Sequence, residues 1–294
     1  MKIGVISDIH SNYHALKTVL KFFEGKIDNL ICLGDFVGYG PQPQECINAF
    51  LDYPLENFLS LGNHDLGVRF RYSYINKDPI EQDYKLLKTF NFRDSAGEML
   101  KRNAQEIQEK HFQFLLNLAF KQIFQIDRKK FYCTHGTPSS RRRENVGRYL
   151  LTPPLQSSEI TIDRLKHDKK AKNADIVIVG HTHRRFLIGR DNFFSWSLIG
   201  DILNKKSTKF PLKFSFHGNR IIFNPGSVGQ PRDGSGNASF SILDLDEKTI
   251  EFHDLEYQMK DFYRLTKKKC VPELQNSTFW ANKLGYFSKI NQPL

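Results

Sequence analysis

The sequence predicts an α/β fold with two sheets, and three observations support this prediction. Short apolar runs alternate with segments of helical periodicity in the first part of the chain. The first three apolar runs each lead into Asp, Asn or His, as expected where ligands gather at the carboxyl ends of parallel strands. From Phe186 onward, short alternating runs separated by Gly, Asn and Asp indicate antiparallel strands and a second sheet.

A strand, loop and helix unit repeats at the N-terminus. Apolar runs predict strands over residues 3–6, 30–33 and 58–61. Helical spacing from Leu16 to Phe23 ends at Gly25, and the second strand leads through a Gly-rich turn at 34–40 into a helix over 41–51 that has Pro near its start.

The middle of the chain is helical between Pro79 and Leu118 and then returns to strands. The predicted strands cover residues 123–126, 130–134 and 175–179. Between the last two, residues 137–173 form an insertion rich in Arg, Pro and Ser, with a predicted helix over 159–167. A loop of this length is typical of a lid or a binding loop.

The remaining elements complete one domain. Antiparallel strands are predicted over residues 186–188, 212–216, 220–223, 238–244 and 249–253, with an irregular excursion over 189–209. We therefore expect a domain over residues 1–258, with insertions near 137–173 and 189–210. A helical tail over 259–294 is expected to pack on the same domain.

The composition is that of a folded protein. The 294 residues are 39% hydrophobic and 26% charged, near the globular average. The N-terminus reads directly into a strand and lacks a secretory signal, and no segment is apolar enough to span a bilayer, so a cytoplasmic location is expected. The scattered cysteines (Cys32, Cys46, Cys133 and Cys270) predict buried thiols.

The charge is +11, with basic clusters at Arg141–Arg143 and Lys267–Lys269. Such a charge attracts anionic substrates, but it is spread along the chain, and no nucleic-acid-binding module is recognised. A nucleic-acid partner is therefore not favoured.

Five short motifs at strand ends indicate a metal centre. They are Ser7-Asp8-Ile9-His10, Gly34-Asp35, Gly62-Asn63-His64-Asp65, His135-Gly136 and Gly180-His181-Thr182-His183. Each fragment alone is weak evidence, but their order at consecutive strand ends makes coincidence remote. Carboxylate, amide and imidazole together suit divalent Mn, Fe or Zn, and two adjacent cations favour in-line attack on phosphorus.

Seven of these side chains can hold two metal ions, with Asp35 shared between them. The predicted ligands are Asp8, His10, Asp35, Asn63, His135, His181 and His183. Bound metal lowers the pKa of water enough to form a bridging hydroxide nucleophile at neutral pH. His64, next to a ligand, is the candidate general acid that protonates the leaving alkoxide.

Three polar residues near the motifs have two interpretations each. Asn12 either contacts a substrate phosphate or caps the next helix, and we favour the first. Asp65 either orients His64 or caps a turn, so it is not assigned a catalytic role. Arg232 either grips phosphate or belongs to a turn-rich connector over 224–232.

The motif series resembles the calcineurin-like metallophosphoesterase superfamily from Asp8 to His183. The segments Gly34-Asp35-Phe36-Val37-Gly38-Tyr39-Gly40-Pro41 and Asn224 to Arg232 are similar to its bacterial-type branch of small phosphodiesterases. The resemblance implies a four-layer αββα sandwich of two mixed sheets flanked by helices. It also implies that His64 is the proton donor.

The resemblance further implies which ligands hold each ion. Metal one would be held by Asp8, His10, Asp35 and His183. Metal two would be held by Asp35, Asn63, His135 and His181. Protein Ser/Thr phosphatases of this superfamily have Asp-Arg where this chain has Gly38-Tyr39, which disfavours protein phosphatase activity.

The sequence thus predicts a phosphoesterase with two divalent ions, Mn favoured over Fe or Zn. We expect it to hydrolyse phosphodiester bonds, or phosphomonoesters, of small nucleotide-like substrates. A non-catalytic scaffold on the same fold, and a nuclease or nucleotide polyphosphate hydrolase, are the alternatives.

Overall fold

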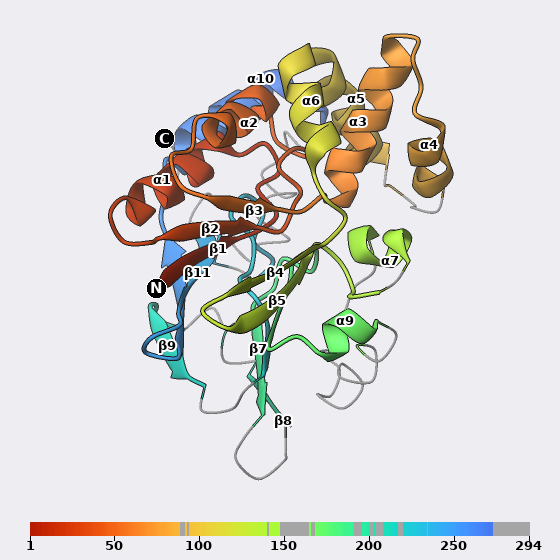
Figure 1. The fold of residues 1–294 in the computed structure, drawn as a ribbon. Helices are drawn as coiled ribbons and strands as arrows, with labels where there is room; N and C mark the ends of the chain where they lie inside the picture. The colour runs from red at the N-terminus through yellow and green to blue at the C-terminus, as the bar shows by residue number, and fades with distance from the viewer. Residues whose placement is uncertain are drawn as a thin grey trace.

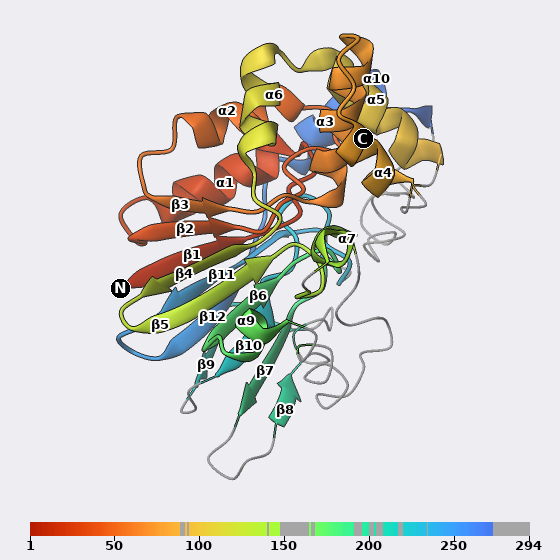
Figure 2. The same cartoon turned by 45° about the vertical axis from the view of Figure 1, so that its right-hand side comes forward.

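Two six-stranded mixed sheets pack face to face between layers of helices (Figures 1 and 2). The computed structural model describes residues 1–88, 92, 94–139, 141–147, 165, 168–190, 196–199, 203, 208–216, 220–233 and 235–272. The predicted four-layer αββα fold is confirmed.

The first sheet has the strand order β3-β2-β1-β11-β12-β9. Its strands are β1 (Lys2–Ile6), β2 (Asn29–Cys32), β3 (Asn57–Leu59), β9 (Leu212–Ser215), β11 (Ala238–Asp244) and β12 (Thr249–Leu255). Strands β1 to β3 are parallel, whereas β11, β12 and β9 join them as an antiparallel series.

The second sheet has the order β4-β5-β6-β10-β7-β8. Its strands are β4 (Gln122–Ile126), β5 (Lys129–Thr134), β6 (Ile176–Val179), β7 (Phe186–Arg190), β8 (Trp196–Ile199) and β10 (Ile221–Asn224). Strands β5, β6 and β10 are parallel, and the outer pairs are antiparallel.

Alternation along the strands explains the layers. In β1, Ile3 and Val5 face the second sheet, whereas Ile6 faces the helices. In β6, Ile176 and Ile178 face the first sheet, and their neighbours Val177 and Val179 pack on the opposite side. Both faces of each central strand are therefore buried, as is typical of parallel strands covered on two sides.

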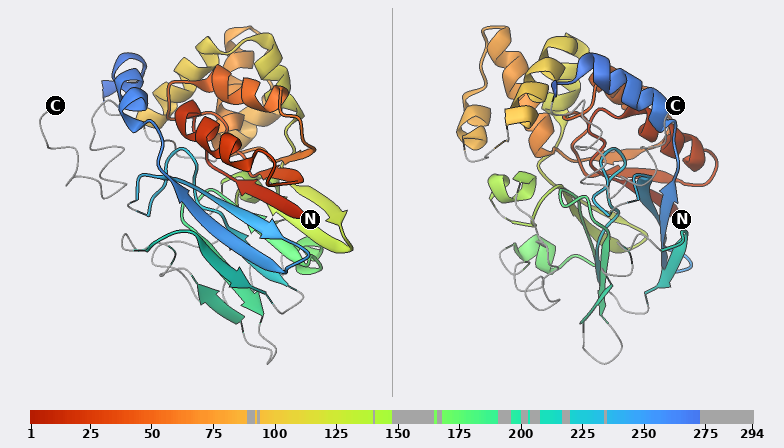
Figure 3. Two further views of the ribbon diagram at one scale, coloured as in Figure 1. Left: turned by 90° about the vertical axis from the view of Figure 1, so that its left-hand side faces the viewer. Right: turned by 180° about the vertical axis from the view of Figure 1, so that it is seen from behind.

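The helices on the outer side of the first sheet are α1 (Tyr13–Phe23), α2 (Pro43–Leu51), α3 (Asn63–Ile75), α4 (Glu81–Leu87), α5 (Asp94–Glu106), α6 (Glu109–Asn117) and α10 (Met259–Lys269). Helices α1 and α2 lie over the strands, whereas α4 and α5 pack on α3. On the second sheet lie the short α7 (Arg142–Gly147) and α9 (Lys169–Lys172). Helix α10 packs against α1, as seen in Figure 3.

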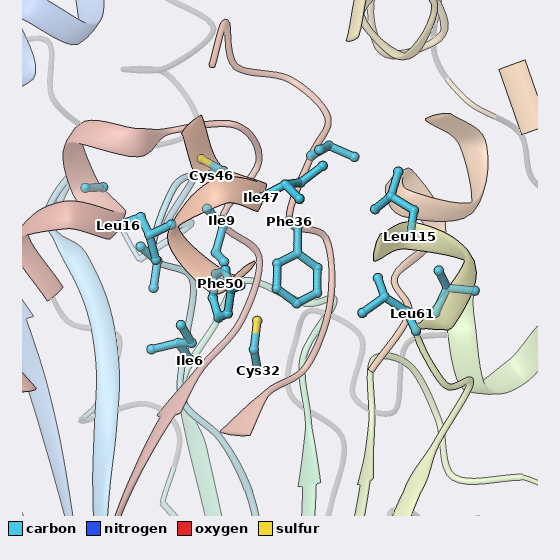
Figure 4. Packing of buried hydrophobic residues seen from close by; sticks show 14 of the residues in the cluster. Ile6, Ile9, Leu16, Cys32, Phe36, Cys46, Ile47, Phe50, Leu61 and Leu115 are labelled. Atoms are coloured by element: carbon cyan, nitrogen blue, oxygen red, sulfur yellow. The ribbon is translucent and has the colours of Figure 1, made fainter. Parts of the chain in front are cut away.

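The apolar core beneath these helices fixes the loops after β1 and β2. Figure 4 shows Ile9 and Phe36, from those two loops, packed with Phe50 of α2. The Phe36 ring meets the Phe50 ring edge to face at 4.8 Å between centroids. Polar residues that flank Ile9 and Phe36 in sequence are thereby turned away from the core.

Three sequence expectations need correction. The strands after Phe186 do not form a separate sheet, because β9, β11 and β12 join the N-terminal strands while β7, β8 and β10 extend the other sheet. The excursion over 189–209 contains strand β8, which pairs with β7. The sequence does not predict helix α3, because the helix lacks a regular apolar stripe. Polar residues of the candidate site occupy its first turn, and Arg69 and Ser73 are among its buried residues.

Some sequence predictions concern residues that lie outside the part of the chain that the structure describes. The predicted helix over 159–167 does so except for Leu165, and so does the tail after residue 272. All four cysteines are buried, and none forms a disulfide with another described residue. Among the residues described, no helix has both the length and the apolarity to cross a membrane.

Candidate metal centre

The sequence motifs meet at one edge of the two sheets. Strand β1 ends at Ile6 and leads to Asp8 and His10, β2 leads to Asp35, and β3 leads to Asn63. In the second sheet, β5 leads to His135, and β6 leads to His181 and His183. The carboxyl ends of the parallel strands therefore place all seven predicted ligands together, as expected for this kind of sheet.

One group of four side chains is closed to solvent. Asp8, His10, Asp35 and His183 are all buried, and their potential ligand atoms lie within 4.8 Å of one another. Nε2 of His10 and Nε2 of His183 are 3.0 Å apart, and the latter lies 3.3 Å from Oδ1 of Asp8. Nε2 of His10 is 3.6 Å from Oδ2 of Asp35.

A second group shares Asp35 with the first. It comprises Asp35, His135 and the partly exposed His181. Oδ2 of Asp35 lies 3.2 Å from Nε2 of His135, and that nitrogen is 3.2 Å from Nδ1 of His181. Oδ1 of Asn63 is also 3.2 Å from Nε2 of His135. The structure thus brings all seven residues into two adjoining groups joined by one carboxylate.

The backbone at these positions is unusual. Five of the seven residues have φ between 49° and 64°: Asp8, His10, Asp35, His181 and His183. Left-handed conformations are uncommon outside glycine and gather at functional sites. The adjacent glycines allow close approach. A Cβ on Gly62 would lie 2.1 Å from Oδ1 of Asp35. The backbone conformation at these positions therefore directs the side chains into the centre.

Backbone carbonyls orient two of the imidazoles. Nδ1 of His183 lies 2.6 Å from the Gln230 carbonyl, and Nδ1 of His135 lies 2.9 Å from the Leu33 carbonyl. A ring that donates from Nδ1 presents the lone pair of Nε2, and such outer contacts commonly fix the tautomer of metal-binding histidines. Both Nε2 atoms face the carboxylates.

Electrostatics favour the metal-binding form of three of the histidines but not of His135. Burial lowers the pKa of His10, His181 and His183 well below its usual value, which keeps these rings neutral. Burial opposes charge on His135 as well, but the nearby Asp35 carboxylate outweighs it and raises the pKa of His135 to about 9. Neutral imidazole is the form that binds metal.

The carboxylates indicate what would complete the site. Oδ1 of Asp8 is buried and accepts no hydrogen bond from the part of the chain that the structure describes, and Oδ2 of Asp35 lies 3.2 Å from Nε2 of His135 and 3.6 Å from Nε2 of His10. Burial raises the pKa of Asp8 to about 6. Buried carboxylate oxygens beside imidazole nitrogens are a donor set that fits divalent cations.

The candidate general acid lies beside the first group. The His64 ring centroid is 4.7 Å from that of His10, and its backbone nitrogen donates to Oδ1 of Asp35 at 2.8 Å. The Tyr39 ring packs against both histidines, with centroids 4.6 Å from His64 and 4.8 Å from His10. Sequence reasoning missed Tyr39 as a site residue, although it occupies the Gly-rich turn that carries the resemblance.

Asp65 and Asn12 make structural contacts. The Asp65 carboxylate accepts backbone N–H groups of Gly62, Asp35 and Val37 at 2.8–3.1 Å, so it joins the loops after β2 and β3. Asn12 caps α1 through Oδ1 and donates from Nδ2 to the Gly229 carbonyl and the Tyr257 hydroxyl. These contacts favour the capping interpretation of Asn12 over substrate contact.

The segment after β10 supports the centre. Ser227 donates to the Asp8 carbonyl, and Asn224 donates to the Gly180 carbonyl, both at 2.8 Å. The backbone nitrogen of Arg232 donates to the His183 carbonyl at 3.1 Å. The partly buried guanidinium of Arg232 helps to lower the pKa of His10, His181 and His183. Arg232 thus adds positive charge beside both groups.

The basic cluster after His135 lies partly outside the description. Arg141 and Arg142 are exposed, and the Arg142 guanidinium lies 5.0 Å from the Phe120 ring centroid. The description does not include the Arg143 side chain.

Fold and site together define a two-sheet protein with a cluster of candidate metal ligands at the edge of its sheets. The family description that matches residues 1–248 is the calcineurin-like phosphoesterase superfamily domain. The chain belongs to this superfamily, as its motifs indicate.

Two relatives and two solved structures extend the comparison. An uncharacterized protein of Methanocaldococcus jannaschii is 32% identical over 92% of this chain and 94% of its own length. A symmetrical bis(5'-nucleosyl)-tetraphosphatase of Wigglesworthia glossinidia brevipalpis is 32% identical, but over only 31% of this chain and 33% of its own length. A metallophosphoesterase from Sphaerobacter thermophilus has a TM-score of 0.69 and 25% identity, covering 96% of this chain and all of that one. A hypothetical protein from Pyrococcus horikoshii, with a TM-score of 0.69 and 18% identity over 95% of this chain and 98% of its own, shares the fold.

Proposed function

We propose that this protein is a dinuclear metal-dependent phosphodiesterase. The observation that supports this most directly is the meeting of two ligand groups at one shared carboxylate, Asp35. Every position of the two groups holds a side chain able to bind a divalent ion. A catalytic role is therefore favoured over a non-catalytic scaffold on the same fold.

The assignment of ligands follows the two groups. Asp8, His10, Asp35 and His183 would hold metal one. Metal two would be held by Asp35, His135 and His181, joined by the nearby amide oxygen of Asn63. We favour Mn, although Fe and Zn accept the same mixture of nitrogen and oxygen donors. When bound, the ions supply Lewis acidity to the phosphoryl group and lower the pKa of the attacking water.

Two residues of the chain would act on the substrate directly. His64 lies beside the first ligand group and would donate a proton to the leaving oxygen. Arg232, whose charge acts on ligands of both groups, would bind the non-bridging phosphate oxygens. The backbone hydrogen bond from Arg232 to His183 keeps this charge close to the centre.

The substrate class is a small phosphodiester with a nucleotide-like group. The positive net charge of +11 favours anionic substrates. The partial similarity to a symmetrical bis(5'-nucleosyl)-tetraphosphatase makes nucleotide polyphosphate hydrolysis the second candidate. Both reactions use the same attack on phosphorus, and they differ in the leaving group.

A metal-replacement assay tests this proposal. Protein stripped with a chelator and reloaded with Mn²⁺ is expected to hydrolyse an activated aryl phosphodiester, and Asp35→Asn is expected to abolish the reaction. Asp52→Asn, at the exposed end of α2, is the matched control and should retain full activity. Full activity of Asp35→Asn would contradict the site assignment.

A substrate panel then separates the two candidates. Aryl monoester, aryl diester, cyclic nucleotides and dinucleoside polyphosphates should be compared by kcat/KM on the same Mn-loaded preparation. Preference for diesters supports the first candidate. Preference for dinucleoside polyphosphates supports the second, and metal binding without turnover on any substrate would favour a scaffold.

A further inference from the structure

Tyr39 lies where it can control the position of the candidate acid. Its side chain is only 8% exposed, and its ring is tilted by 50° to the His64 ring and by 56° to the His10 ring. The Phe92 ring meets His64 edge-on, with centroids 5.5 Å apart. His64 is therefore bordered by two aromatic rings and by a predicted metal ligand.

The backbone beside Tyr39 approaches both histidines closely. Gly38 has φ of 137°, and a Cβ there would lie 2.7 Å from Nδ1 of both His10 and His64. Gly40 donates its N–H to the His10 carbonyl at 2.9 Å. The turn thus contacts both rings through its backbone and through the Tyr39 side chain.

Helix α5 holds this turn in place. Asn103 accepts the Gly38 N–H through Oδ1 at 2.8 Å and donates from Nδ2 to the Gly40 carbonyl at 3.2 Å. The hydroxyl of Ser11 also donates to Oδ1 of Asn103 at 2.9 Å. A buried amide that bonds both sides of Tyr39 fixes the path of the backbone there.

The Tyr39 ring is supported from behind by α5 and α10. It shares an apolar cluster with Ala96 and Met99 of α5 and with Phe262 of α10. The C-terminal helix is anchored at the same turn, since Nζ of Lys269 lies 3.4 Å from the Pro41 carbonyl. Tyr39 therefore connects the helical layer to the histidines of the centre.

We propose that Tyr39 is a positioning residue for His64, holding its imidazole in the orientation needed to protonate the leaving group. This inference depends on the proposed function, because it assigns a partner to the general acid of that reaction. A fixed orientation matters because proton transfer requires hydrogen-bond distance to the leaving oxygen. The support is aromatic packing, so it should survive loss of the hydroxyl but not loss of the ring.

A leaving-group series tests this role. Tyr39→Leu, Tyr39→Phe and wild type should be compared on methyl aryl phosphodiesters that release para-nitrophenol or unsubstituted phenol. Protonation matters most for the more basic leaving group, and general acids contribute about 10²–10⁴-fold. Tyr39→Leu is therefore expected to lower kcat about 10–100-fold on the phenol ester and less than about threefold on the nitrophenol ester.

Two variants provide the comparison. Tyr39→Phe keeps the ring and should follow wild type on both esters. Tyr53→Leu removes a partly buried ring from the helical side of the first sheet and should show no leaving-group dependence. The proposal would be overturned if Tyr39→Leu lowered kcat equally on both esters. It would also be overturned if Tyr39→Phe lowered kcat as much as Tyr39→Leu does.

A spectroscopic readout is independent of turnover. In metal-free protein with labelled histidine, the ring current of Tyr39 should shift the carbon-bound proton resonances of His64, and Tyr39→Leu should remove that shift. An unchanged His64 spectrum would refute the contact itself. If the wild type hydrolyses no phosphoester but the shift is lost in Tyr39→Leu, the proposed function fails while the positioning contact stands.

Discussion

The two ligand groups of the centre differ in their access to solvent. The group of Asp8, His10, Asp35 and His183 is wholly buried, whereas the group of Asp35, His135 and His181 includes one partly exposed imidazole. Both take ligands from the two sheets, so the difference does not arise from the fold layers. It arises at His181, which is less buried than His183 two residues later. In the proposed dinuclear centre, the ion of the buried group should therefore be retained firmly, and the ion of the group that contains His181 should exchange.

The sharpest test of this difference removes one imidazole from each group. We expect His183→Ala and His181→Ala each to lower kcat/KM by at least about a hundredfold, more than loss of an outer contact to a metal ligand usually costs. Excess Mn²⁺ should restore part of the activity of His181→Ala, because water can reach the open group. It should not restore His183→Ala.

Metal content measured by plasma mass spectrometry, alongside activity against Mn²⁺ concentration, checks this prediction. Equal rescue of both variants would show that the two groups exchange alike, and the distinction between a closed and an open group would fail.

A substitution at Gly62 should damage both groups at once. Its added Cβ would lie 2.1 Å from Oδ1 of Asp35, so Gly62→Ala must displace the shared ligand. Overpacking of this kind costs about 1–3 kcal/mol in the free energy of unfolding. We expect that loss together with reduced occupancy of both ions, measured by urea unfolding and metal analysis.

Gly189→Ala in β7 is the matched control, because nothing lies within 4 Å of the Cβ it would add. Loss of only one ion in Gly62→Ala would show that Asp35 is not shared.

The smallest expected effect is a pH dependence of metal uptake. His135 belongs to the open group, and the Asp35 carboxylate raises its pKa to about 9 in the metal-free protein. Below that pH the ring is protonated, so metal binding must release its proton, and affinity should rise with pH and level off above about 9. The buried histidines of the closed group, with lowered pKa values, should release none.

Calorimetric titration with Mn²⁺ in buffers of different ionisation enthalpy measures this release. No proton release at neutral pH would mean that His135 is already neutral, and the electrostatic contrast between the groups would then be lost.

The ligand motifs could be predicted from sequence because each follows a strand directly. Asp8, Asp35 and His135 each lie within three residues of a strand end, so the convergence of strand ends places them together. Their use as metal ligands stays a prediction.

Other features depend on contacts between distant segments. Local periodicity could not show that β11 pairs with β1, because strand pairing depends on tertiary packing. The same holds for Tyr39, whose proposed role depends on contacts with Asn103 and Phe262 far along the chain. For Asn12 the sequence allows a phosphate contact or a helix cap and favours the first. In the structure its amide nitrogen donates to the Gly229 carbonyl and the Tyr257 hydroxyl, and no local signal predicts these two contacts.

The left-handed backbone at five of the candidate ligands places the conformational preference of the chain in conflict with the need for a ligand side chain. Glycine adopts this conformation without steric cost, so glycine at His10 or His183 would relax the metal-free chain while erasing a ligand. If only the stability of the folded chain were under selection, glycine would be favoured at these positions. Histidine and aspartate at such points are what selection for a working centre would retain.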